Sequence, residues 1–216
     1  MTGDFLIRQA MIHDADAMAR INILALNTNE LWQFMMKDVE PDALQEFVSQ
    51  SFRHRLSSAT NLYFVVVQAQ TLQIVGCAGL SLPKSSISAN GNSSEVAEDP
   101  EWPPGINRGL ANHFYNEILN QGQRYGFDAS KDACRTGTNI HPDYHGQGLG
   151  TRLIQHCNRC PEVQGVNLYV GVNDASHGIF LKEGFVELGH MDTLLNKYGG
   201  PDLVVRSTSC YRPAHQ

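Results

Sequence analysis

The sequence predicts a single α/β domain built on a mixed, mostly antiparallel sheet of about seven strands, with helices on both faces. Short runs of β-branched and aromatic residues alternate with segments whose apolar residues recur at helical spacing. The runs at 62–67 and 74–80 are almost entirely apolar, which is typical of strands covered on both faces. A strand, a helix and a strand follow residue 134, the order of a crossover between neighbouring parallel strands.

The composition fits one globular domain and argues against some partners. Of 216 residues, 42% are hydrophobic and 18% are charged, so the chain can bury a substantial core. The net charge of -6, with only 16 Lys and Arg residues, argues against nucleic acid as a partner. Because neither a run of about 18 apolar residues nor a signal-peptide pattern occurs, we expect a cytoplasmic protein without membrane contact.

Five cysteines occur without the density of a disulfide framework. Cys157 and Cys160 form a C-x-x-C pair beside His156, but a zinc site needs about four ligands. A redox pair belongs at the start of a helix, whereas this pair lies late in a predicted one. We expect buried free thiols and no metal, with metal or redox use of the pair as the alternative.

The first half of the chain supplies three predicted strands and two helices. Residues 5–10 form a strand, and Asp14 caps a helix that follows it. A second helix follows Pro41 and, like the first, is expected to cover the sheet. The runs at 62–67 and 74–80, joined by a short polar link, are expected to pair antiparallel. The apolar stripe of the second helix consists of Leu44, Phe47, Val48, Phe52 and Leu56.

A long excursion separates the third and fourth strands. Residues 84–108 are rich in Ser, Asn, Gly, Glu and Pro, and helical spacing returns at about 110–118. We therefore expect an insertion at about 84–130, because loops this long inside a compact domain usually serve function or are disordered. The elements predicted after it are a strand at about 134–140, a helix at 151–160, a strand at 166–172, a short helix at 175–183, and strands near 186–188 and 203–211.

Three glycines stand immediately before the helix at 151–160. The unpaired amides and positive dipole end of a helix N-terminus attract anions, and Gly146, Gly148 and Gly150 allow close backbone approach. This predicts a pyrophosphate site. The dinucleotide-binding pattern fails because Thr151 occupies its third glycine position, and no Gly-Lys-Ser/Thr of a nucleotide hydrolase follows. A purely structural turn remains the alternative.

Residues 140–151, IHPDYHGQGLGT, resemble motif A of the GNAT superfamily of N-acetyltransferases, whose core is Gln/Arg-x-x-Gly-x-Gly/Ala after a hydrophobic strand end. Asn173, followed by Gly-Phe at 184–185, resembles the second signature of the family. Residues 7–10 resemble its opening strand. The resemblance covers nearly the whole chain except about 84–130.

The resemblance implies one GNAT acetyltransferase domain over residues 1–216, with the acyl-CoA N-acyltransferase fold. It implies a sheet splayed between strands four and five, with the pantetheine arm in the opening. The co-substrate would be acetyl-CoA, and an amine would attack it directly without a metal. The backbone N–H of Ile140 would hold the thioester carbonyl. The implied cofactor contacts are Asn139, Ile140, His145, Gly146, Gln147, Gly148, Leu149, Gly150, Thr151, Asn173 and Phe180.

Two positions depart from the family pattern. His145 replaces Gln or Arg, at a position that contributes largely its backbone. Phe180 stands where the family commonly has the Tyr that protonates the leaving thiolate, so Tyr169 or Tyr211 would have to stand in. For the general base, Asp132 is the first candidate. His113 and Glu101 are weaker candidates for the same role.

The acceptor is an amine of a small molecule or peptide, and the protein is expected to act as a monomer or homodimer. One hypothesis is that the excursion forms the acceptor pocket, with an acidic group attracting the amine and an apolar wall beside it. A solvated acidic loop is the alternative. The alternative to an acetyltransferase is an acyl-CoA binding or sensing protein that is catalytically weak or inactive. A third hypothesis is an oxidoreductase that binds NAD. The acidic group consists of Glu95, Glu98, Asp99 and Glu101, and the wall of Trp102, Pro103 and Pro104.

Overall fold

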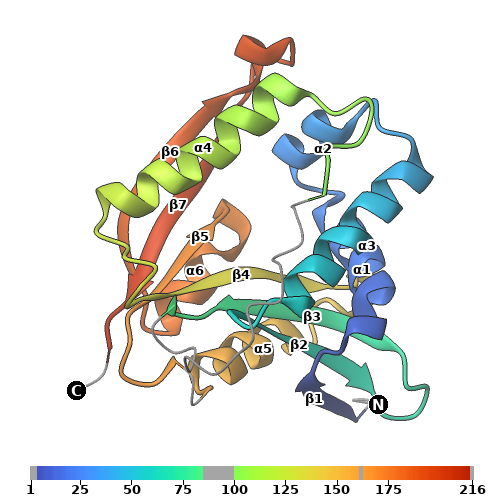
Figure 1. The fold of residues 1–216 in the computed structure, drawn as a ribbon, viewed down its shortest axis with the longest axis vertical. Coiled ribbons are helices and arrows are strands. Elements are labelled where there is room, and N and C mark those ends of the chain that lie inside the picture. Colours follow the sequence, from blue (N-terminus) through green and yellow to red (C-terminus); the bar gives the residue numbers. More distant parts are fainter. Residues whose placement is uncertain (1–3, 85–99, 161–162, 215–216) are drawn as a thin grey trace.

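The computed structural model of the chain describes residues 4–84, 100–160 and 163–214. One sheet of seven strands runs through it in the order β1-β2-β3-β4-β5-β7-β6 (Figure 1). Every neighbouring pair is antiparallel except β4 and β5, which are parallel. The predicted α/β fold with a mixed, mostly antiparallel sheet is confirmed.

The strands are β1 (Phe5–Gln9), β2 (Asn61–Gln68), β3 (Ile74–Ser81), β4 (Ala133–Ile140), β5 (Leu168–Val172), β6 (Val186–Leu194) and β7 (Val204–Arg212). The α-helices are α1 (Ala15–Leu26), α2 (Glu30–Met36), α3 (Pro41–Ser57), α4 (Arg108–Arg124), α5 (Leu149–Asn158) and α6 (Asp174–Lys182). Short 3-10 turns occupy Ile12–Asp14, Pro142–Tyr144 and Leu195–Tyr198.

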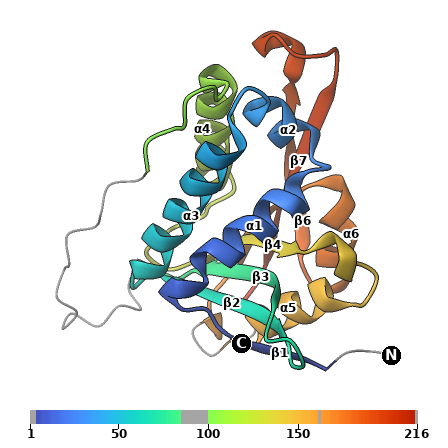
Figure 2. The same ribbon diagram turned by 90° about the vertical axis from the view of Figure 1, so that its right-hand side faces the viewer.

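Helices cover both faces of the sheet, as the apolar strands β2 and β3 predict. Side chains of α1 and α3 pack with alternate residues of β2, including Tyr63 and Val65, in one buried cluster. The intervening residues Leu62, Phe64 and Val66 pack on the other face with α5 and α6. Figure 2 shows α1 and α3 on the side of the sheet opposite to α5. The two faces therefore have separate cores.

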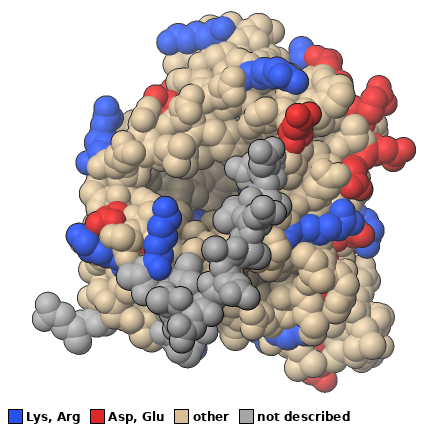
Figure 3. Space-filling model, in the orientation of Figure 1, with Lys and Arg blue, Asp and Glu red and all other residues tan. Residues whose placement is uncertain are grey.

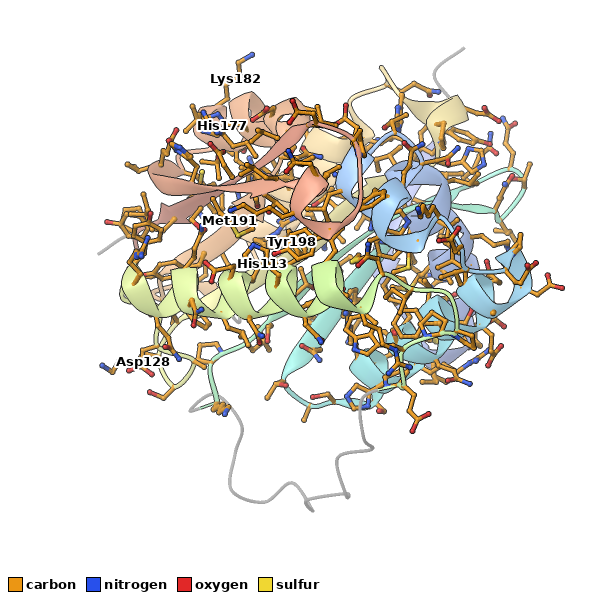
Figure 4. The ribbon with its side chains drawn as sticks, turned by 90° about the horizontal axis from the view of Figure 1, so that it is seen from above. His113, Asp128, His177, Lys182, Met191 and Tyr198 are labelled. Atoms are coloured by element: carbon orange, nitrogen blue, oxygen red, sulfur yellow. The ribbon has the colours of Figure 1, made fainter. Side chains whose placement is uncertain are left out.

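Helix α4 lies along the β6–β7 hairpin (Figure 1), which it meets near the hairpin's tip. The rings of His113 and Tyr198 lie 5.4 Å apart between centroids, and Asn107 donates to the Tyr198 carbonyl at 3.0 Å. Figure 4 shows His113, Tyr198 and Met191 gathered beside this helix. Helical spacing in the second half of the predicted insertion is thus confirmed. Residues 85–99, its first half, lie outside the described residues.

Three predicted details were wrong. Asp14 does not cap α1 through its carboxylate, which instead accepts from Arg8 at 2.7 Å and from the Met11 N–H at 2.8 Å. Helix α5 begins at Leu149, two residues earlier than expected, because Gly148 takes the left-handed N-cap conformation. Strand β6 continues past Leu188, since the pairing with β7 passes through a register shift there.

Helix α2 was not predicted, although its N-cap signal is present. Asn29 accepts from the Trp32 N–H at 2.8 Å, and Leu31, Met35 and Met36 are buried. The helix has only seven residues, so the periodic pattern is too short to stand out. In the part of the chain that the structure describes, no helix is both long enough and apolar enough to cross a membrane.

Candidate functional site

Strands β4 and β5 are paired only at their beginnings, where Ala133 lies opposite Leu168 and Cys134 lies opposite Tyr169. From there β4 continues to Ile140 and β5 to Val172 without further pairing, so the sheet opens into a fork. The splay expected between the fourth and fifth strands is therefore present. We call the paired beginning the closed end of the fork and the other the open end.

Backbone groups of β4 face this fork. The His141 N–H donates to the Val75 carbonyl at 2.9 Å, so residue 141 points its backbone groups toward β3. Successive residues of a strand point these groups to opposite neighbours. Ile140, opposite Gly76, therefore turns its N–H and C=O toward the fork, and Thr138, opposite Ala78, does the same. A ligand in the fork meets two strand amides that the β3 ladder does not use.

The glycine turn lies at the open end of the fork. Gly146 and Gly148 have φ angles of 74° and 72°, values that favour glycine, and no heavy atom lies within 4 Å of a Cβ built at either position. The backbone conformation favours glycine at both positions, and the space that a side chain would fill is open. The first helical bond of α5 runs from the Arg152 N–H to the Gly148 carbonyl at 3.0 Å, so the amides of 149–151 have no helical partner. Gly148 offers no side chain to cap them. The result is an open anion site.

A cavity of about 910 Å³ connects the fork, the glycine turn and the space beneath α1 to α4. Figure 3 shows the surface hollowed near the centre of the view. The cavity is lined by every predicted cofactor contact except Gln147. On the side of α2, α3 and α4 its wall is largely aromatic. The aromatic members of that wall are Trp32, Phe47, Phe52, Phe114 and Tyr115.

Residues 111–187 match the family model described as acetyltransferase (GNAT) domain. Over this segment the chain is similar to the GNAT family. The segment runs from α4 through the glycine turn to the start of β6, so it contains the whole fork. No protein of curated function matches the chain in sequence.

Solved structures similar to the chain include several acetyltransferases. One is described as histone acetyltransferase HPA2 and related acetyltransferase from Corynebacterium glutamicum, with 14% identity and a TM-score of 0.60, over 98% of this chain and 97% of that chain. Another is the ribosomal-protein-S18-alanine N-acetyltransferase from Escherichia coli, with 16% identity and a TM-score of 0.57, over 99% and 96%. At these identities the likeness shows that the fold is shared.

The His145 side chain has a role in the glycine turn that the sequence did not indicate. Its Nε2 lies 2.9 Å from the carbonyl oxygen of Ile140. A carbonyl oxygen only accepts hydrogen bonds, so Nε2 carries the proton and donates. The sequence interpretation, in which this position contributes largely its backbone, is incomplete. The imidazole fixes the peptide unit that follows Ile140, at the mouth of the fork.

Asn173 and Phe180 flank the fork from α6. Asn173 is the N-cap of this helix, and its Oδ1 accepts from the N–H and the hydroxyl of Ser176 at 3.0 and 2.7 Å. Asn173 also lines the cavity. The Phe180 ring is buried and packs edge-on against Phe185, with centroids 5.2 Å apart. The position at which the family commonly has a phenol thus holds no proton donor.

Asp132 and Tyr169, the candidate base and acid, lie at the closed end of the fork and do not line the cavity. Asp132 is buried and accepts from the Asp128 N–H at 2.9 Å and from Asn167 Nδ2 at 3.0 Å. Burial, followed by the charges of Asp132 and Tyr211, raises the pKa of Tyr169. A phenol with a raised pKa is a weaker acid. The structure does not bring either residue to the open end, and the geometry favours structural roles for both.

The other candidates are also distant from the fork. Tyr211 pairs with Tyr169 across β5 and β7, His113 stacks on Tyr198, and Glu101 is exposed. Glu95, Glu98 and Asp99 lie outside the described residues. Trp102 is half-buried and stacks on Phe47 and Tyr115, which fits the predicted apolar wall.

The charges around the cavity were not anticipated from the sequence. Among the lining residues that the structure describes, the charged side chains are Arg55, Arg135 and Arg206, and no carboxylate is included. Arg206 is paired with Asp192 at 2.7 Å. The sequence did contain a sign that Arg135 is unusual, because an arginine inside a predicted strand of small residues is either buried with partners or functional.

Proposed function

We propose that this protein transfers an acetyl group from acetyl-CoA to an amine of a small molecule or peptide. The fork between β4 and β5, which opens at the glycine turn, is the observation that carries the proposal. A pantetheine arm contains two amides and fits between strand edges with unused backbone groups. The pyrophosphate fits the amides of 149–151 at the start of α5. We further propose a cytoplasmic protein, because none of its five cysteines forms a disulfide in the described part of the chain.

The reaction needs little beyond this scaffold. In this proposal the N–H of Ile140, which faces the fork, donates to the thioester carbonyl oxygen as that oxygen gains negative charge. The amine nitrogen attacks the carbonyl carbon, the new C–N bond forms, and the C–S bond breaks. A thiol of this kind has a pKa of about 8.5, so its thiolate leaves near neutral pH without an acid. Water takes the proton from the amine. No covalent enzyme intermediate and no metal are required.

Calorimetric titration with CoA and acetyl-CoA tests the binding half of the proposal, and release of the free thiol in the presence of an amine panel tests the chemistry. We expect micromolar binding and amine-dependent release. Failure of CoA to bind at millimolar concentration would contradict the proposal. The panel should contain polyamines, amino acids, aromatic amines and peptides with free N-termini.

A second candidate function is an acyl-CoA binding or sensing protein. Phe180 favours it, because a buried phenyl ring supplies no proton where the family commonly has a phenol. The titration separates the two candidates. Tight binding of acetyl-CoA without thiol release for any amine would support the sensor.

His145 is expected to act as a positioning residue. Replacing it by Ala removes the hydrogen bond to the Ile140 carbonyl, and kcat/KM should fall up to about 10-fold, the range for one hydrogen bond. His145→Gln supplies an N–H donor of similar reach and should restore most of the activity. If His145→Ala and His145→Gln lose the same amount, the bond to Ile140 has no part in turnover.

Asp132→Asn tests whether the carboxylate at the closed end takes part in catalysis. The amide loses one acceptor for the Asp128 N–H and Asn167, so the free energy of unfolding should drop by about 1–3 kcal/mol. Because Asp132 does not line the cavity, kcat should change less than about 2-fold. Urea titration and steady-state kinetics measure the two effects. A fall in kcat of about 100-fold would instead identify Asp132 as the base.

A further inference from the structure

Arg135 is a buried cation on β4. Its side chain is only 4% exposed and lies on the α5–α6 face of the sheet. Nη1 donates to the Ile154 carbonyl at 3.2 Å, and Nη2 donates to the Thr138 hydroxyl at 2.7 Å. The guanidinium also lies over the Phe180 ring, 5.8 Å from its centroid. Arg135 therefore contacts Thr138 of strand β4 and Phe180 of helix α6, the residue that flanks the fork.

This cation has no counter-ion among the described residues. No Asp or Glu in that part of the chain forms an ion pair with Arg135, and Nε has no hydrogen-bond partner. Burial lowers its pKa. A guanidinium has five N–H donors, and only two bonds are made here. A buried charge without a counter-ion is unfavourable, and one with unused donors that lines a cavity is a candidate ligand site.

We propose that Arg135 binds the carboxylate of an acyl group on CoA, so that the site takes, besides acetyl-CoA, a short acyl-CoA with a terminal carboxylate, such as malonyl- or succinyl-CoA. This inference rests on the proposed function and widens its range of donors. Arg135 lines the cavity and bonds to Thr138, whose backbone N–H faces the fork two residues from Ile140. Two free N–H groups of a guanidinium match the two oxygens of a carboxylate.

The face of the sheet on which Arg135 lies indicates that the carboxylate belongs to the acyl donor and not to the amine acceptor. Arg135 contacts α5 and α6, whereas the aromatic wall of the cavity comes from α2, α3 and α4 on the opposite side. An acceptor amine approaching along that wall comes from the face of the sheet opposite to the face that Arg135 contacts. In the transfer step the amide C–N bond forms and the C–S bond breaks, as for acetyl. The carboxylate keeps its charge and leaves as part of the product amide.

Butyryl-CoA and succinyl-CoA provide a matched pair of donors, because both acyl groups have four carbons and only succinyl has a carboxylate. Calorimetry with the full-length protein should show succinyl-CoA or malonyl-CoA binding at least about 10-fold tighter than butyryl-CoA. Arg135→Met keeps the length and volume of the side chain without its charge. In this variant the ratio of the two affinities should fall to about 1. Arg135→Lys should retain part of the preference.

The outcomes are distinguishable from failure of the proposed function. If CoA itself does not bind, both proposals fail. If CoA and acetyl-CoA bind but wild-type protein binds butyryl-CoA as tightly as either carboxylated donor, this inference alone is overturned, even if Arg135→Met does not fold. If Arg135→Met raises only the KM of a carboxylate-bearing amine, the carboxylate belongs to the acceptor, which also overturns it.

Discussion

Gly148→Asp is expected to weaken the binding of acetyl-CoA by about 100-fold or more. Gly148 is the left-handed N-cap of α5, and Asp tolerates this conformation better than most residues. Its carboxylate would cap the helix and occupy the amides that otherwise meet the pyrophosphate. Like charges about 4 Å apart near a protein surface repel by roughly 4 kcal/mol, and each 1.4 kcal/mol is tenfold in affinity.

Gly148→Asn is the matched control, since Asn has the same shape and tolerates the same backbone conformation without the charge. It should lose less than about 10-fold in affinity, and both variants should melt within a few degrees of the wild type. Calorimetric titration and thermal unfolding measure these quantities. Equal losses for Asp and Asn would mean that the turn excludes side chains sterically and that the anion site is elsewhere.

Ile140→Pro is expected to lower kcat by about 100-fold or more while the sheet stays intact. Proline removes the N–H of Ile140, which faces the fork and takes no part in the β3 ladder. Along its fork side β4 is locally an edge, where proline is tolerated. Removing one donor to a developing oxyanion typically costs about 10²–10³ in kcat.

Ile140→Ala is the control for this substitution, because it also removes the buried side chain but keeps the N–H. The difference in kcat between the Pro and Ala variants therefore measures the amide. Single-turnover kinetics at saturating acetyl-CoA separate it from weaker binding. If both variants retain the same kcat, the thioester carbonyl does not meet residue 140.

Sequence reasoning located the elements whose signals are local. The apolar runs of β2 and β3, the spacing in α3 and the glycines before α5 all reflect physical demands on their own segments. The part of β6 beyond Leu188 was missed, because only two of its residues are buried and a glycine stands at its bulge.

The parts of the site that escaped prediction depend on residues distant in space. The bond between His145 and the Ile140 carbonyl exists because the turn folds back on the strand end. The burial of Arg135 depends on α5 and α6 closing over β4. Asp132 looked available at a strand start, yet Asp128 and Asn167 already occupy its oxygens. Spacing along the chain carries no information about such partners.

Two residue pairs join β4 to β5, and they divide the sheet into two parts. One part is β1-β2-β3-β4 and the other is β5-β7-β6. If acetyl-CoA binds in the fork as proposed, its pantetheine arm would bridge the two unpaired strand edges. Ligand at 100 times Kd stabilises a folded protein by about 2.7 kcal/mol. Acetyl-CoA would then raise the free energy of unfolding of the chain as well as supply the acyl group.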